Sequence, residues 1–118
     1  MFINYSHHPS AQWGEAQLEA ARVYGEVVDI PFAKVKPEAS SDEVIALAGA
    51  ETKKILEKLP KAVLCQGEMV LTYHLVRLLK QNGVRVLCAT TNRHIDETIV
   101  DGKTVKQSVF DFVQFREY

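Results

Sequence analysis

The stretch Ala62-Val63-Leu64-Cys65-Gln66-Gly67-Glu68 places a short apolar run directly before a polar corner that opens a helical pattern. An all-apolar run of this length is typical of a parallel strand that is covered on both faces. Leucines then recur at helical spacing over about residues 68–81, and Asn82-Gly83 supplies a C-terminal stop. The segment therefore predicts a strand, a turn and a helix of an α/β sheet.

Two further strands and one helix are predicted at the N-terminal end of the chain. Residues 1–5 and 26–30 are each predicted to form a short strand, and Pro31 ends the second. Between them, Ser10 is in position to cap a helix that Gly25 ends.

A second helix is expected between Ser40 and Pro60. Ser40 and Glu43 have the spacing of a capping box. The helix that follows has one apolar stripe, formed by Val44, Ala48, Ile55 and Leu59.

The sequence pattern changes in the C-terminal third of the chain, where no further helix is predicted. Residues 84–89 form another all-apolar strand, whereas 95–100 and 103–113 flank Asp101-Gly102, a dipeptide suited to a two-residue type I′ turn. The fold class expected for residues 1–118 is a single Rossmann-like α/β domain. It has a mostly parallel sheet, flanking helices and a C-terminal β-hairpin.

Composition narrows the function classes. The chain has 118 residues, 47% of them hydrophobic, and a net charge of −1. Such a charge gives no positive field to recruit long nucleic acid. No apolar run approaches the ~20 residues of a membrane span. The sequence also lacks a P-loop, a GxGxxG motif and a nucleophile elbow. Cys65 and Cys88 are expected to be reduced, which fits a cytoplasmic protein.

Three polar corners follow predicted strands, and they are the candidate functional segments. They are Ser6-His7-His8-Pro9-Ser10, Gln66-Gly67-Glu68 and Ala89-Thr90-Thr91-Asn92-Arg93. The carboxyl ends of parallel strands meet at one edge of a sheet, where open α/β sheets bind ligands. The sequence therefore predicts a single site built from all three corners.

Each corner also has a plain structural explanation. Gly67 allows a ligand close to the backbone and the helix dipole, or it simply turns the chain while Glu68 caps the helix. Arg93 beside two threonines suits a phosphate, or it is a solvated loop arginine. His7 and His8 point to opposite sides of an extended segment, so they do not share a metal. One of them is placed to transfer a proton, or both are surface residues.

The order of these features resembles the small CRISPR-associated Rossmann-like proteins related to CARF domains, a group that includes stand-alone ring nucleases. The resemblance covers nearly the whole chain. It rests on the first strand running into Ser6-His7-His8-Pro9, on Val63 to Glu68 with Thr72-Tyr73, on Ala89 to Arg93, and on the ending Val109 to Tyr118.

The resemblance implies a protein of type III CRISPR defence that binds cyclic oligoadenylate, with the four-membered ring as the expected ligand. Ring nucleases of this group cut that messenger without a metal or cofactor and act as homodimers, with the ligand across the twofold axis. The terminal hairpin is the expected dimer contact, because it carries more apolar residues than one strand face needs. These are Val109, Phe110, Phe112, Val113 and Phe115.

The chemistry implied is attack of a ribose 2′-hydroxyl on the adjacent phosphorus, which leaves a 2′,3′-cyclic phosphate. The catalytic candidates are His8, Arg93 and Glu68. Arg93 would stabilise the charged phosphorane, and His8 or His7 would move a proton. The candidates for holding the ligand are Ser6, His7, Gln66, Gly67, Thr90, Thr91 and Asn92. Two alternatives stay open: a protein that binds the messenger without cutting it, and an interaction subunit whose corners only end secondary structure.

Overall fold

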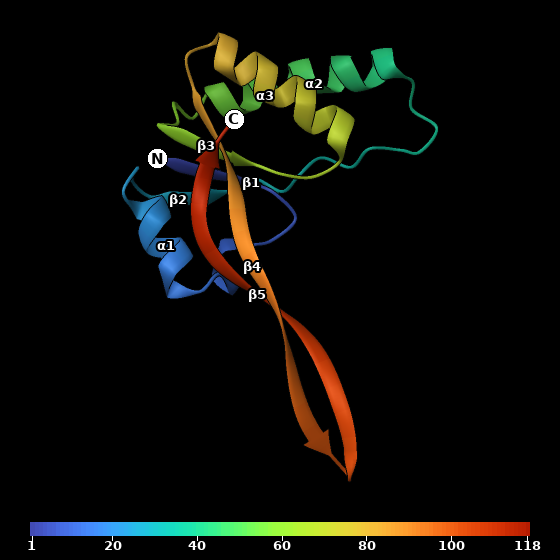
Figure 1. The fold of residues 1–118 in the computed structure, drawn as a ribbon. Coiled ribbons are helices and arrows are strands. Elements are labelled where there is room, and N and C mark those ends of the chain that lie inside the picture. Colours follow the sequence, from blue (N-terminus) through green and yellow to red (C-terminus); the bar gives the residue numbers. More distant parts are fainter.

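The computed structural model describes residues 1–118 and has one five-stranded sheet with the strand order β2-β1-β3-β4-β5 (Figure 1). The first four strands in that order are parallel, and β5 is antiparallel to β4. The predicted α/β class with a C-terminal hairpin is confirmed. The strands are β1 (Phe2–Tyr5), β2 (Val27–Asp29), β3 (Ala62–Cys65), β4 (Arg85–Val100) and β5 (Lys103–Glu117).

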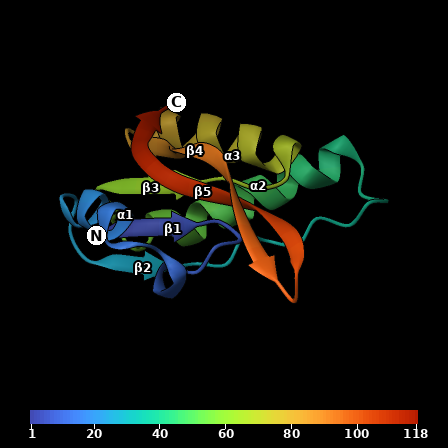
Figure 2. The ribbon, with the colours of Figure 1, turned by 60° about the horizontal axis from the view of Figure 1, so that its bottom comes forward.

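Three helices cover the two faces of the sheet. These are α1 (Glu15–Arg22), α2 (Ser41–Leu56) and α3 (Met69–Gln81). Helices α2 and α3 lie together on one face, and α1 lies on the other (Figures 1 and 2). Successive residues of β1 and β3 alternate between the two cores, since side chains of a strand point to opposite faces. Ile3 and Val63 join the larger core with α2 and α3, whereas Phe2 and Leu64 join the smaller core with α1. None of the helices combines the length and hydropathy needed to cross a membrane.

The helix ends follow the predicted caps in two of three cases. Ser40 and Glu43 form the complete capping box at the start of α2, and Glu68 caps α3. The prediction that Ser10 caps the first helix is wrong. Ser10 begins a short 3-10 helix (Ser10–Gln12), and α1 starts only after Gly14 because Trp13 and Gly14 are extended.

Leu59 does not lie on the apolar stripe of α2, contrary to the prediction. The helix ends at Leu56, and Leu59 is 83% exposed with a φ of 51°. The physical reason is the following residue, Pro60, whose ring disfavours helical backbone at the residue before it.

The largest difference from the sequence expectation concerns β4. It does not end at Ala89 but continues to Val100 and is 16 residues long, so no corner exists at Thr90–Arg93. That segment contains no glycine or proline and is rich in β-branched residues, which favours continued strand. The predicted Asp101-Gly102 turn is confirmed, with φ values of 51° and 75°. We call residues 92–111 the arm, because there the two strands project from the body as a ribbon (Figure 1).

Candidate functional site

A cavity of about 710 Å³ lies on the α1 side of the carboxyl edge of the sheet. Strands β1 and β3 lead into it through Ser6, His8 and Gln66, and β4 contributes Ala89 and Thr91. The opposite wall consists of Trp13, the first residues of α1 and two aromatic residues of β5, Phe110 and Phe112. The predicted edge thus carries a cavity of the size that small-molecule sites have.

Four of the ten predicted site residues line this cavity: Ser6, His8, Gln66 and Thr91. Ser6 and His8 of the first corner thus line the same cavity as Gln66 of the second. The third contributes Ala89 and Thr91, and all of its residues belong to a continuing strand rather than a turn.

A buried polar network holds the histidine corner in place. Asn4 is 1% exposed, and its Nδ2 donates to the His8 carbonyl at 2.8 Å and to Asp29 Oδ1 at 3.0 Å. The Ser6 hydroxyl donates to Asn4 Oδ1 at 2.6 Å and accepts from the His8 amide at 3.2 Å. Trp13 Nε1 also donates to the His8 carbonyl, at 3.2 Å. Because the Ser6 hydroxyl is committed to this network, its structural contribution is to fix His8 rather than to offer a donor to a phosphate.

The two histidines serve different cavities. His8 lines the main cavity, whereas the His7 ring lies 5.0 Å from that of Phe32 and lines a separate hollow of about 300 Å³. Both side chains are exposed. Of the two imidazoles, His8 is therefore the one positioned for chemistry at the main cavity.

Glu68 and Gly67 have structural tasks. The Glu68 carboxylate accepts from the amides of Val70 at 3.1 Å and Leu71 at 2.7 Å, so it caps α3 and does not line the main cavity. A Cβ on Gly67 would lie only 2.5 Å from the Phe32 ring. Gly67 is thus required by core packing, whatever it contributes to a ligand.

The remaining predicted residues point away from the main cavity or stand on the arm. The Thr90 hydroxyl donates to the Gln114 carbonyl at 2.9 Å, and Arg93 Nη2 donates to Ser108 Oγ at 3.1 Å. Arg93 and Asn92 are exposed on the arm and do not line the main cavity. The expected cluster of Arg93, Glu68 and His8 is therefore not assembled within one chain.

The electrostatics of the cavity are mixed. Its lining includes the carboxylates of Glu15 and Asp111 but no lysine or arginine. Asp111 pairs with His94 at 3.1 Å. The start of α1 has the opposite electrostatic effect to these carboxylates. Gly14 offers no side-chain cap there, so the amides of the first turn are open. Those amides carry the positive end of the helix dipole and are the main groups that favour an anion here.

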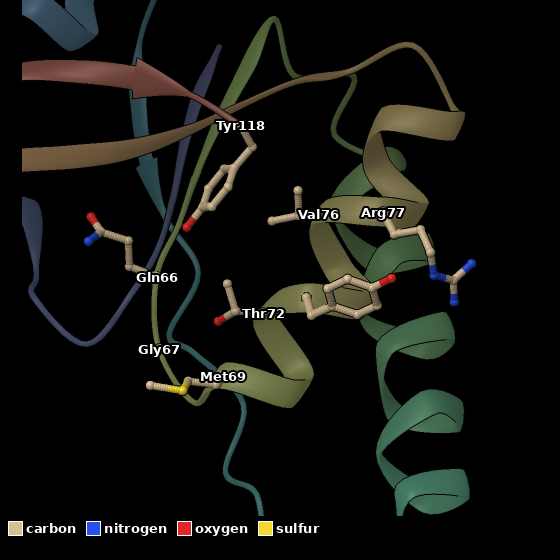
Figure 3. A pocket seen from close by; sticks show the side chains of 8 residues that line it. Gln66, Gly67, Met69, Thr72, Val76, Arg77 and Tyr118 are labelled. Atoms are coloured by element: carbon tan, nitrogen blue, oxygen red, sulfur yellow. The ribbon is translucent and has the colours of Figure 1, made fainter.

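A second cavity, of about 520 Å³, lies on the α3 side of the same edge (Figure 3). Gln66 lines both cavities and is fixed between them, since its Oε1 accepts from the Ala89 amide at 2.9 Å. Tyr118 forms one side of the second cavity, and its hydroxyl donates to the Cys65 carbonyl at 2.8 Å. Burial raises the pKa of Tyr118 above its usual range. Thr72 Oγ1 is buried beside this cavity without a hydrogen-bond partner.

Both cysteines are free, and nowhere do three or more His, Cys, Asp or Glu side chains gather closely enough to hold a metal ion. Burial, with a smaller contribution from nearby Cys88, raises the pKa of the Cys65 thiol to about 12.

Sequence reasoning missed Asn4 and Asp29, which position His8. The available signal was a single amide side chain inside the otherwise apolar strand β1, since a buried polar residue needs partners. It also missed the aromatic wall that Phe110 and Phe112 contribute, because these residues were assigned to a dimer contact.

Comparisons with known proteins give one finding. Searches of curated proteins and of solved structures each return no match to this chain. A family model described as "Uncharacterized protein MJ1673 family" matches residues 1–116. The chain therefore belongs to the MJ1673 family.

Proposed function

We propose that the protein binds cyclic oligoadenylate in the main cavity and cleaves it, with His8 as the group that transfers the proton. The observation that carries the proposal is the composition of the cavity wall. It combines an imidazole, the uncapped start of α1 and three aromatic side chains, Trp13, Phe110 and Phe112. A phosphate, a base and a proton-transfer group would each find a partner there. The resemblance to ring nucleases supplies the ligand class.

Phosphates of the ligand would lie against the amides of α1, where a helix start favours negative charge. An adenine would stack on the aromatic wall, as bases do on such side chains in single-strand binding proteins. Gln66 Oε1 is held by the Ala89 amide, which leaves its Nε2 as a donor to base or ribose. The cavity has the size of a site for one small molecule, so a single chain would enclose part of a four-nucleotide ring.

The reaction needs little from the protein beyond position. The ribose 2′-oxygen attacks the adjacent phosphorus, and the bond from phosphorus to the 5′-oxygen breaks. The products have a 2′,3′-cyclic phosphate and a 5′-hydroxyl. The proton of the 2′-hydroxyl passes to His8, and the leaving oxygen takes one from water. A positioned acid or base of this kind typically contributes ~10²–10⁴-fold.

The second candidate is a protein that binds the messenger without cutting it. A specific observation favours it: of the three predicted catalytic side chains, only His8 lines the cavity. Glu68 caps α3 and Arg93 is bonded to Ser108 on the arm. A missing phosphorane donor typically costs ~3 kcal/mol of barrier, which would leave binding intact and turnover slow.

The deciding experiment incubates purified protein with cyclic tetra-adenylate and EDTA, and follows the ligand by chromatography. His8→Ala is compared with His7→Ala, a matched control because the two histidines are adjacent and exposed but line different cavities. We expect the wild type to cleave cyclic tetra-adenylate. His8→Ala should abolish this turnover, and His7→Ala should retain it. Calorimetry on the same proteins separates the candidates: binding without turnover supports sequestration, and no binding refutes both.

A further inference from the structure

We infer that the second cavity is a binding site for a small, uncharged aromatic molecule with one hydrogen-bonding group, of the phenol or indole type. The cavity lies on the α3 side of the sheet edge, and its volume of about 520 Å³ is within the range of small-molecule sites. Apart from Gln66, it shares no lining residue with the main cavity. The site is therefore independent of the function proposed for the main cavity.

Helix α3 has two faces that carry apolar residues, and the core covers only one of them. Leu71, Leu75 and Leu79 are fully buried in the larger core. A second row has the helical spacing i, i+3, i+4, i+7 and lines the cavity: Met69, Thr72, Tyr73 and Val76. Met69 and Tyr73 in this row are 85% and 64% exposed. The second row is therefore a wall of the cavity and not a part of the core.

The ring of Tyr118 forms the opposite wall, so the space lies between two walls (Figure 3). Val76 extends from α3 towards this ring in the same view. A flat ring placed between the walls would pack against the ring of Tyr118 and the thioether of Met69. Aromatic rings attract one another in offset or edge-to-face arrangements, and a thioether sulfur favours the edge of a ring. The walls therefore favour a planar aromatic body over an aliphatic chain.

Thr72 supplies the polar contact. Its Oγ1 is buried without a hydrogen-bond partner, although the residue lines the cavity. Figure 3 shows this side chain on the side of α3 that is turned towards β3 and Tyr118. Native structures pair nearly all buried hydroxyls, because an unpaired one destabilises the fold. A hydroxyl or ring N–H of a ligand would donate to this oxygen. A water molecule could do the same, but it would leave the apolar row beside Thr72 in contact with water.

The charges around the cavity favour a neutral ligand. No Asp or Glu side chain lines it, so a cation would have no partner. The one lining cation is Arg77, whose Nη2 lies 3.2 Å from His74 Nδ1. In Figure 3 its guanidinium points away from Thr72 and Tyr118. Burial raises the pKa of the Tyr118 hydroxyl, which therefore stays neutral. Because an unpaired charge is costly to bury, an uncharged molecule fits this lining best.

The test titrates p-cresol, an uncharged phenol, into ¹⁵N-labelled protein and follows the amide NMR signals. Toluene, which lacks the hydroxyl, and 4-methylbenzoate, which is charged, are titrated in parallel. We expect p-cresol to shift the signals of residues 66–77 with a Kd of about 0.1–1 mM, as suits a ligand of this size. 4-Methylbenzoate should leave these signals unchanged. Thr72→Val, which replaces the hydroxyl by a methyl group, should weaken p-cresol binding about fivefold and should not weaken toluene binding.

A second pair of variants locates the site. Val76→Trp fills the cavity and should abolish binding of p-cresol. Val70→Trp is the matched control, because Val70 is also on α3, is 43% exposed and lines neither cavity; it should bind like the wild type. Circular dichroism checks that each variant is folded, and if Val76→Trp is not, the wild type and Thr72→Val decide the matter. The inference is overturned if about 10 mM p-cresol leaves the signals of residues 66–77 unchanged, or if a folded Val76→Trp binds it normally. It is also overturned if Thr72→Val binds p-cresol as tightly as the wild type does.

Discussion

Gly67→Ala tests whether this glycine is required by packing or by the approach of a ligand. A Cβ at this position would lie 2.5 Å from Cε2 and 2.6 Å from Cδ2 and Cζ of Phe32. Carbon atoms in contact are normally ~3.5–4.0 Å apart, so the ring would have to retreat by about 1 Å. It has little room, because its centroid lies 5.1 Å from that of Tyr5. Tyr5 in turn is fixed by a 2.7 Å hydrogen bond to Glu51.

The expected cost is that of overpacking a core, ~1–3 kcal/mol of unfolding free energy. For a domain of this size that corresponds to a fall in Tm of roughly 4–12 °C, measured by calorimetry or circular dichroism. Gly49→Ala is the matched control. Gly49 lies within α2 with open space around it, so alanine there should raise stability by ~0.5–1 kcal/mol.

A double-mutant cycle with Phe32→Leu identifies the cause. Leucine removes the ring atoms that the new methyl group meets, so Gly67→Ala should cost at least ~1 kcal/mol less in that background. Additive effects of the two substitutions would refute the packing argument. An unchanged Tm together with lost ligand binding would instead assign Gly67 to the approach of a ligand.

Three further changes have defined outcomes. Asn4→Ala removes the donor shared by His8 and Asp29 and the oxygen that accepts from the buried Ser6 hydroxyl. It should cost ~1–3 kcal/mol in urea unfolding, because the Ser6 hydroxyl loses its acceptor; a cost below 0.5 kcal/mol would contradict the network. Asp111→Asn should tighten binding of cyclic tetra-adenylate roughly two- to fivefold in calorimetry at low salt, since a carboxylate leaves the cavity wall, and the gain should shrink at high salt. The pKa of Cys65 is raised from 9.0 to about 12, so the folded state retains a proton that the unfolded chain loses. Stability should therefore be complete below pH 9 and decline as the pH rises towards 12, and urea midpoints should show a smaller decline for Cys65→Ala.

The body of the fold was predictable because its local signals agree with its packing. Residues 62–65 are apolar on every position and are buried on both faces, and the capping box at Ser40 marks the start of α2 at the residue observed. Where two local rules compete, prediction failed. The apolar stripe of α2 seemed to continue to Leu59, but the steric effect of Pro60 ends the helix earlier.

The candidate site was predictable in position but only in part in composition. The carboxyl edge holds a cavity with His8 and Gln66, as strand-to-helix corners imply. The prediction that Arg93 lies at a turn is wrong, because the hydrophilic segment after the buried run continues the strand. In a two-stranded ribbon with both faces exposed, polar and β-branched residues continue the strand, and hydrophobicity alone gives no sign of its end.

The pairing between β4 and β5 is irregular at Thr90 and Thr91, where Val113 is the extra residue on β5. Such bulges bend a strand and increase its twist. This one lies where the ribbon leaves the body, and its neighbours Thr91 and Phe112 also line the main cavity. The joint that sets the arm's direction is thus part of the cavity wall. A change in the arm's direction at this joint would therefore move Thr91 and Phe112 and alter the shape of the cavity.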